Sequence, residues 1–253
     1  MKIKVLASGS KGNCTLIVGG NTKILIDAGI TETQIKNSLL EIGIDLKKID
    51  GILISHTHSD HIKGLLQLVK RHNLKVFASP ELLYDLINII PIESIVVVQN
   101  KFYIGELNVE LIETSHDVIS YGFILEHQEN SLVYITDTGY INKRYYSNTK
   151  NKNVYIIEAN HDEEMLMNGP YPYNLKQRVI GDKGHLSNRY TGKYLKKVIG
   201  ENTKYIFLAH ISENNNTYDL ALTQIKEELT DSSFDFERII VTHQNEETNM
   251  IEV

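Results

Sequence analysis

Short apolar runs separated by glycine-containing turns open the chain. Residues 3–7, 15–18 and 23–26 are rich in isoleucine, leucine and valine. This pattern predicts three neighbouring strands of a β-meander. The first turn, residues 8–15, holds two glycines but lacks the spacing of a phosphate-binding loop, and no helical pattern follows it. We therefore interpret this turn as the bend of a β-hairpin.

Helical and strand patterns alternate from residue 33 onward. Apolar residues recur at helical spacing in two segments, and Gly43 follows the first of them as a terminator. The predicted elements are helices over residues 33–42 and 62–69, strands over 52–54 and 75–77, and a helix opened by Pro80. Such alternation predicts helices that pack on the outside of a sheet.

The second half of the chain returns to strands and then to alternation. The predicted elements are strands over 96–98, 102–104, 107–112, 121–126, 132–136 and 153–159, a helix over 188–199, a strand ending before His210, a helix over 220–229 and a strand over 238–241. No internal repeat or linker interrupts the series. We therefore expect one domain over residues 1–253, a length at which two packed sheets are an ordinary outcome.

The densest chemistry of the chain follows the predicted strand at 52–54. His56, His58, Asp60 and His61 lie within six consecutive residues. A tight loop after a strand turns alternate side chains inward, so we expect His56 and His58 to converge on one ion. Asp60 and His61 would then hold a second ion. Zinc, manganese and iron(II) accept such mixed imidazole and carboxylate ligands, and the alternative is a polar loop of solvated histidines.

The motif His56-x-His58-x-Asp60-His61 resembles the signature of the metallo-β-lactamase superfamily. The resemblance implies an α/β (α+β) fold in which two mainly antiparallel or mixed β-sheets, flanked by helices, form a four-layer αββα sandwich. It also implies two divalent metal ions at one edge of the sandwich, zinc or manganese, with iron(II) as a further candidate. The motif is specific for the superfamily and not for a substrate.

The resemblance also assigns residues outside the histidine-rich loop. His116, Asp137 and His210 each lie just beyond a predicted strand. The implied ligands are His56, His58 and His116 for the first ion, Asp60, His61 and His210 for the second, and Asp137 as the bridge between them. Asp27, which closes the third strand of the meander, is expected to orient a ligand histidine, and a turn aspartate is the alternative.

Further motifs narrow the resemblance. The segments are 158–162 (EANHD), 171–172 (YP), 184–188 (GHLSN) and 208–212 (LAHIS). Their order resembles that of the phosphodiesterase branch that includes tRNase Z, and as a set they are most similar to the bacterial YycJ (WalJ) family. That family is regarded as 5′-to-3′ DNA exonucleases linked to mismatch repair. The sequence lacks the long inserted domain of RNase J-type enzymes and the glycine-rich arm of tRNase Z.

One segment reverses the charge balance of the chain. The whole sequence has a formal net charge of −6, yet residues 174–197 hold seven basic residues and one acidic residue. This segment favours a phosphate-bearing substrate. His185 stands at the mouth of the predicted helix, whose N-terminus and dipole favour a bound phosphate. Tyr190 and Tyr194 are either stacking faces for bases or core tyrosines.

These residues suggest hydrolysis of a phosphodiester by a metal-bridging hydroxide. Metal coordination lowers the pKa of water from about 16 to about 7, which supplies a nucleophile at neutral pH. Asp60 would orient the hydroxide, while His185, held by Glu158, would bind the phosphate and protonate the leaving oxygen. The predicted catalytic residues are Asp60, His185 and Glu158, and the predicted substrate-binding residues are His185, Ser187, Asn188, Arg189, Lys193 and His161. For His161 a structural role is the alternative.

Composition bears on the compartment. No stretch approaches the ~20 apolar residues of a membrane-spanning helix, and the sequence begins with a strand pattern in place of a secretory signal. Cys14 is the single cysteine, which excludes an internal disulfide and agrees with a reducing compartment. We expect a cytoplasmic protein that acts on nucleic acid, DNA before RNA, without a membrane partner. The sequence does not decide the oligomeric state.

Three rival functions stay open at this point. An RNA-processing nuclease would use the same site on a different nucleic acid. A small-molecule metallohydrolase acting on thioesters, lactones or cyclic phosphodiesters would share the ligands but would not need the basic segment or His185. A non-catalytic nucleic-acid-binding module would be expected to have lost ligands, and none is missing from the sequence.

Overall fold

The computed structural model describes residues 1–253, which form two compact units. The first unit comprises Met1–Leu111, Leu125–Glu129 and Gln244–Val253, and the second comprises Ile112–Ile124 and Asn130–His243. Each unit is therefore built from segments that are separate in the sequence. The division into units does not test the prediction of one domain over residues 1–253, which stays a prediction.

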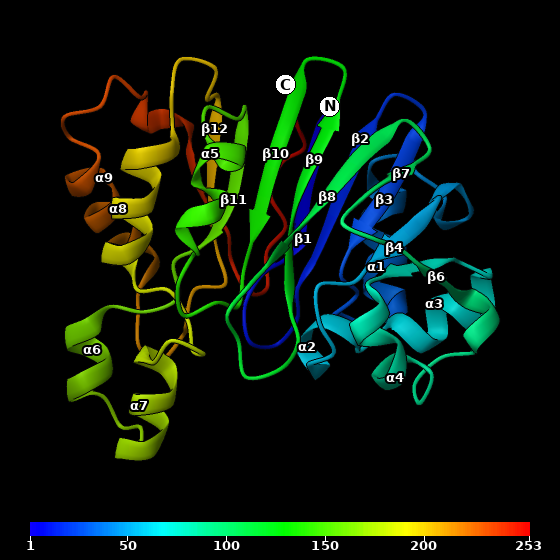
Figure 1. The fold of residues 1–253 in the computed structure, drawn as a ribbon, viewed down its shortest axis with the longest axis horizontal. Helices are drawn as coiled ribbons and strands as arrows, with labels where there is room; N and C mark the ends of the chain where they lie inside the picture. The colour runs from blue at the N-terminus through cyan, green and yellow to red at the C-terminus, as the bar shows by residue number, and fades with distance from the viewer. The chain divides into compact units, whose positions relative to one another are not determined.

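A seven-stranded mixed sheet begins with the predicted meander (Figure 1). Its strands, in spatial order, are β14 (Ile251–Glu252), β1 (Lys2–Ala7), β2 (Cys14–Gly19), β3 (Thr22–Ile26), β4 (Gly51–Leu53), β5 (Val76–Ala78) and β6 (Ile95–Val97). Pairing is antiparallel from β14 to β3 and parallel from β3 to β6. Ile26 and Leu53, the last residues of β3 and β4, are partners in register, so the loops that follow these two strands start side by side.

The helices of the first unit begin and end at recognisable signals. α1 (Glu32–Glu41) starts at a capping box, in which Thr31 and Gln34 each accept a hydrogen bond from the other's backbone N–H. The helix predicted over 62–69 is instead two helices, α2 (Ser59–Ile62) and α3 (Leu65–His72). The break occurs because Gly64 N donates outside the helix, to Ala28 O at 2.8 Å. The short helix α4 (Leu83–Leu86) follows a 3₁₀ turn at Pro80–Leu82.

The second seven-stranded sheet contains four neighbouring strands that run parallel. In spatial order its strands are β13 (Ile239–Val241), β12 (Tyr205–Ala209), β11 (Val154–Glu158), β10 (Asn130–Ile135), β9 (Tyr121–His127), β8 (Leu107–Glu113) and β7 (Lys101–Ile104). The pairings from β10 to β13 are parallel, and Glu158 is in register with Ala209. Parallel strands end at the same edge of a sheet, so the residues that follow β10, β11 and β12 gather there.

Five helices belong to the second unit: α5 (Tyr146–Thr149), α6 (Glu163–Asn168), α7 (Tyr173–Ile180), α8 (Asn188–Val198) and α9 (Tyr218–Glu228). α8 and α9 lie side by side and contact β11 and β13 respectively (Figure 1). Tyr155, Tyr194 and Ile225 are part of the core beneath them. Because Tyr194 is only 1% exposed, it is a core tyrosine and not a stacking face for bases.

Three of these helices, α5, α6 and α7, were not predicted. The segment around residues 169–173, which contains glycine and proline, is the connection between α6 and α7. α6 has an N-cap at Asp162, whose side chain accepts a hydrogen bond from Met165 N at 2.7 Å. None of the helices in the chain is long and apolar enough to cross a lipid bilayer.

Candidate metal centre

Four donors gather in the loop after β4 and in the short helix α2 that follows it, and we call His56, His58, Asp60 and His61 the loop cluster. Backbone hydrogen bonds fix this loop to the turn that follows β3: Ala28 N donates to His61 O at 2.7 Å, and Asp27 N donates to Leu53 O at 2.9 Å. Gly29 lies so close that a Cβ atom there would overlap the carbonyl oxygen of Asp60. The turn therefore requires glycine at this position and holds the loop in one conformation.

Asp27 orients one histidine of the loop cluster. It is fully buried and adopts a left-handed backbone conformation with φ of 59°. Its carboxylate accepts hydrogen bonds from Ser55 N, Ser55 Oγ and His61 Nδ1, each at 2.8 Å. Because Nδ1 of His61 must carry the proton in this contact, Nε2 is the ring atom that can bind a cation. This contact is the one expected of an aspartate that supports a ligand histidine.

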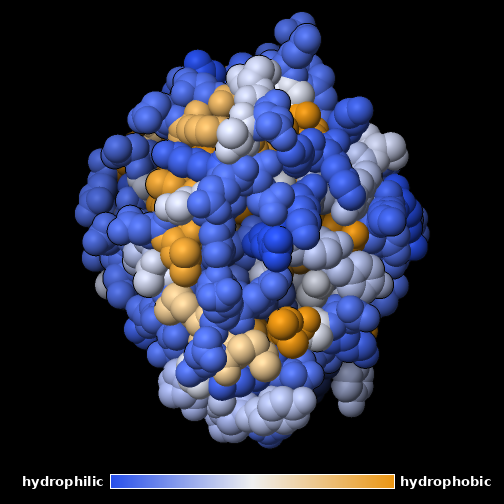
Figure 2. Space-filling view, turned by 90° about the vertical axis from the view of Figure 1, so that its left-hand side faces the viewer, coloured by the Kyte–Doolittle hydropathy of each residue, from blue (hydrophilic) through white to orange (hydrophobic).

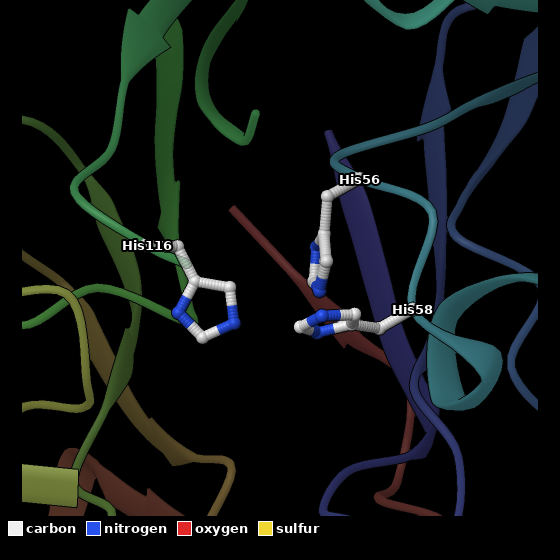
Figure 3. A group of neighbouring side chains, drawn as sticks. All are labelled: His56, His58 and His116. Atoms are coloured by element: carbon white, nitrogen blue, oxygen red, sulfur yellow. The ribbon is translucent and has the colours of Figure 1, made fainter. Parts of the chain in front are cut away.

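The three histidine rings of the loop cluster lie against one another. The ring centroids of His56 and His58 are 4.8 Å apart with the rings edge to face, and Figure 3 shows both side chains reaching out of the same loop. The centroids of His56 and His61 are 4.0 Å apart. Ser55 Oγ lies 3.0 Å from His56 Nδ1 and so contacts both the aspartate and this histidine. His56 and His61 are buried, whereas His58 and Asp60 are half-buried.

Asn13 is a contact of the loop cluster that the sequence did not reveal. Its Oδ1 accepts from Gly9 N at 2.8 Å, and its Nδ2 lies 3.3 Å from Asp60 Oδ2 and 3.0 Å from His61 Nε2. The amide therefore reaches the two residues of the loop cluster that were expected to hold the second ion, Asp60 and His61. The only signal was its place in a glycine-containing hairpin turn, and that pattern has no specific chemical meaning.

A second group of donors lies at the edge where the parallel strands end, and we call Asp137, Glu158, His185 and His210 the strand-end cluster. Their donor atoms all lie within 4.8 Å of one another. Asp137 and His210 follow β10 and β12, and each has a left-handed backbone with φ of 53°. Such a conformation costs free energy in a non-glycine residue and is concentrated at functional sites.

Glu158 connects the two histidines of the strand-end cluster. Its Oε1 accepts hydrogen bonds from His185 Nδ1 at 2.7 Å and from His210 Nδ1 at 2.9 Å. Complete burial opposes its ionisation, but the charge and the hydrogen bond of His185, with the hydrogen bond of His210, outweigh burial and lower the pKa of Glu158 to about 2. The residue is therefore a carboxylate at neutral pH. Each histidine then carries a proton on Nδ1 and has Nε2 as its reactive atom.

His116 follows β8 and is also shown in Figure 3. Its Nδ1 lies 3.2 Å from Gly184 O, and its ring centroid is 5.2 Å from that of His185. Burial lowers the pKa of His116, and the attraction of Asp137 only partly opposes this shift. A neutral imidazole whose Nδ1 donates to a carbonyl has Nε2 as its ligand atom.

The predicted substrate-binding residues separate into two groups. Ser187 caps α8 by accepting from Tyr190 N at 3.2 Å, and its hydroxyl donates to Glu163. Asn188 is fully buried, and its amide bonds to Asn216 and Gln224. Both side chains therefore hold the loop before α8, whereas the other two predicted residues of this segment, Arg189 and Lys193, are exposed.

His161 is enclosed within the second unit. It is 1% exposed, and neither ring nitrogen has a hydrogen-bond partner. Burial lowers its pKa to about 4, although the charge of Glu158 opposes the shift. Its carbonyl oxygen accepts from Asn188 N at 2.9 Å. A buried polar group without a hydrogen-bond partner typically costs ~1–3 kcal/mol of folding free energy. The ring of His161 is such a group, and the charge of Glu158 acts on it.

The donors of both clusters fit divalent metal ions. Imidazole nitrogens and carboxylate oxygens form the ligand sets of zinc, manganese and iron(II) sites. In each cluster a buried carboxylate holds the Nδ1 of a histidine, Asp27 for His61 and Glu158 for His210. Hydrogen bonding of this kind fixes the tautomer of metal-binding histidines and strengthens them as ligands.

Comparisons with known proteins agree with this chemistry. The model of the Beta-lactamase superfamily domain matches residues 22–211. Exodeoxyribonuclease YycJ of Bacillus anthracis is 35% identical over 240 residues, which cover 92% of this chain and 91% of that protein. Exodeoxyribonuclease WalJ of Streptococcus pneumoniae is 35% identical over 230 residues, which cover 87% and 85%. The crystal structure of the metallo-beta-lactamase fold protein YhfI from Bacillus subtilis matches with a TM-score of 0.75 at 16% identity and covers 98% and 99% of the two chains.

The matched domain and the fold define a metallo-β-lactamase-fold hydrolase. Within this superfamily, the chain belongs to the family of the YycJ and WalJ proteins. The predicted fold class is confirmed, because the two mixed β-sheets with their helices match the fold of the solved relative over nearly its whole length. The resemblance drawn from the histidine-rich loop and the later motifs is confirmed as well.

Proposed function

We propose that the protein is a dinuclear metal-dependent phosphodiesterase that degrades DNA from its 5′ end. The observation that carries the proposal is the contact of His185 with Glu158, because a histidine held by a buried carboxylate is suited to proton donation. Two relatives with the name exodeoxyribonuclease support a nucleic acid as the substrate. DNA is preferred over RNA on the same ground, and the cytoplasm is the proposed location.

The proposed ligands follow the motif of the superfamily. His56, His58 and His116 would hold one ion, Asp60, His61 and His210 would hold the second, and Asp137 would contact both. The proposal is supported by the orientation of His61 by Asp27 and of His210 by Glu158. Zinc and manganese are the preferred ions, and iron(II) is a further candidate because its ligand preferences overlap with theirs.

Divalent cations, when bound, lower the pKa of coordinated water from about 16 to about 7 and offset charge on the phosphoryl oxygens. The protein groups supply the rest of the chemistry. Asp60 orients the attacking water. Glu158 accepts from Nδ1 of His185 at 2.7 Å, and a proton on Nε2 of the same ring passes to the leaving oxygen. Arg189 and Lys193, exposed on α8, contact the phosphate backbone.

End-labelled and circular nucleic acids test the proposal. The wild-type protein with zinc or manganese should release labelled mononucleotides from the 5′ end of linear DNA and leave closed circular DNA intact. Equal digestion of circles would show an endonuclease, and preference for RNA would show an RNA-processing enzyme. Hydrolysis of lactones or thioesters without any digestion of nucleic acid would overturn the proposal.

Replacement of His185 tests the proton-transfer step. His185→Ala should keep both metals bound and lower turnover of DNA by roughly 10²- to 10⁴-fold. A p-nitrophenyl phosphodiester needs little leaving-group protonation, so it should lose much less activity in the variant. His72→Ala, which removes a histidine that bonds to Glu32, serves as the control and should behave as wild type. Equal losses on the two substrates would assign phosphate binding to His185 and not proton donation.

A further inference from the structure

Helix α7 presents an exposed stripe that contains aromatic and aliphatic side chains. Tyr173, Gln177 and Ile180 recur at positions i, i+4 and i+7, so they share one helix face. All three are exposed, Tyr173 by 71% and Ile180 by 41%. Val179 faces the other way and is buried. The stripe is therefore available to a partner.

The stripe continues onto two neighbouring segments of the second unit. Arg178 forms an ion pair with Asp117, two residues before Ile119, which is 49% exposed. Gly139 packs against the backbone of Gly181 and Asp182, directly after α7, and is followed by Tyr140, which is 38% exposed. We call Ile119, Tyr140, Tyr173 and Ile180 the α7 platform.

The platform starts beside His185. His185 N donates to Val179 O, in the last turn of α7, at 2.9 Å. The helix has 8 residues and so is ~12 Å long. This length corresponds to three or four nucleotides of a stacked strand at about 3.4 Å each. A strand with a phosphate at His185 therefore has room for several bases along the platform.

The charge around the platform suits a nucleic acid. Residues 169–183 include Lys176, Arg178 and Lys183 against one acidic residue, Asp182, and Arg178 is paired with Asp117. Lys183 is exposed just before His185. In Figure 2 the lower end of the face, where Figure 1 has α6 and α7, is paler and more hydrophobic than the largely hydrophilic surface above it. Exposed aromatic rings flanked by cations, in a chain with a net charge of −6, are the pattern of a base-stacking surface.

We propose that the α7 platform binds a short run of unpaired nucleotides next to the scissile phosphate. Bases stack on Tyr173 and Tyr140, Ile180 and Ile119 fill the space between them, and Lys183 contacts the backbone. The inference rests on the proposed function and adds one requirement to it. The strand at the active site must be single-stranded, so a duplex must open at its end before it is cut.

Binding of an uncleavable strand to the metal-loaded protein tests the platform. The probe is a fluorescent 5′-phosphorylated oligonucleotide with phosphorothioate linkages, and its affinity is measured by fluorescence anisotropy. The double variant Tyr173→Ala/Ile180→Ser should bind roughly tenfold more weakly or worse, because stacked bases contribute strongly to single-strand affinity. The single variant Tyr140→Ala provides an independent measurement. Tyr103→Ala, which removes a tyrosine of equal exposure on β7, should bind as wild type does.

The same probe with abasic sites separates stacking from charge. If the bases stack, the wild type should lose affinity for the abasic probe and the difference between wild type and double variant should disappear. An undiminished difference, or equal affinity of wild type and variant for the normal probe, would overturn the platform. A change of oligomeric state in the double variant would assign the stripe to a second copy of the chain instead. Failure of the wild type to digest any nucleic acid would overturn the proposed function, whereas digestion with no effect of the variants would overturn the platform alone.

Discussion

The loop cluster and the strand-end cluster contain the same kinds of donor but are built in different ways. The loop cluster takes its donors from six consecutive residues, and a single turn after β3 holds them in place. The strand-end cluster takes one donor from each of three strand ends and one from the loop before α8, and Glu158 holds two of its histidines. The first cluster therefore depends on local backbone contacts, and the second depends on the register of the parallel strands.

This difference predicts where each cluster is vulnerable. In the strand-end cluster one carboxylate fixes both the histidine proposed as the acid and a histidine proposed as a ligand, so one substitution affects two functions. In the loop cluster Asp27 contacts one ligand histidine directly, His61, and reaches His56 only through Ser55, so its loss should affect the ion of His61 most. Substitution of these two carboxylates compares the clusters directly.

The largest effect is expected for Glu158→Gln. A neutral amide accepts more weakly from His185 Nδ1, so turnover should fall by roughly 10²- to 10⁴-fold. Metal held through His210 should bind more weakly as well, while the ion held by His56 and His58 should be retained. Turnover and metal content are measured on the same preparation. Glu164→Gln, which changes an exposed carboxylate on α6, is the control, and a variant at Glu158 with wild-type turnover would remove Glu158 from the mechanism.

A smaller effect is expected for Asp27→Asn. The amide no longer accepts as strongly from His61 Nδ1, so the affinity for one of the two ions should fall by roughly 10- to 100-fold, the usual cost of losing such a contact. Isothermal titration of the metal-free protein would show one weakened site and one unchanged site. Asp50→Asn alters a turn aspartate of the same unit that accepts from Lys23 N and should leave both affinities unchanged. Weakening of both sites to the same degree would contradict the separate roles of the clusters.

The two clusters also differ in how much of each could be read from the sequence. The loop motif identified its four donors at once, because ligand spacing and sequence spacing coincide there. His116, Asp137 and His210 were singled out as strand-end residues, but only the family pattern made them ligands. Asn13 was missed because its contact with Asp60 and His61 depends on how the first hairpin packs against the loop.

The fold shows the same limit. The strands and most helices were predicted because their apolar periodicity is strong, and the meander is as expected. α6 and α7 were missed, because few apolar residues face the core in either helix and glycine and proline surround their connection. The split between α2 and α3 depends on a hydrogen bond from Gly64 to a distant turn, which no local pattern encodes.

The smallest effect is expected for His161, which neither cluster holds by a hydrogen bond. Its pKa is about 4 in the folded protein against 6.5 for an ordinary histidine, so folding excludes a proton that the unfolded chain binds. Its contribution to stability is therefore complete above pH 6.5 and is lost as the pH falls from 6.5 towards 4. Glu158, His185, Glu163 and Asp162 are the charged or titratable groups that act on it.

His161→Leu should raise the melting temperature slightly at neutral pH, because it removes a buried ring without hydrogen-bond partners. It should also flatten the loss of stability between pH 6.5 and 4. Thermal unfolding at a series of pH values measures both effects. Leu40→Ala, which changes an exposed side chain on α1 that does not titrate, serves as the control and should keep the wild-type pH profile in this range. A strongly destabilised His161→Leu variant would show that the ring has a partner in the folded protein.

We propose above that the chain binds two metal ions through the ligands that the superfamily motif implies. Anomalous diffraction at the zinc edge, on crystals grown with excess zinc, tests it most directly. The account predicts two peaks, one ligated by His56, His58 and His116, the other by Asp60, His61 and His210, with Asp137 contacting both. A single occupied site under these conditions, or two peaks each ligated by only one of the two clusters, would contradict it.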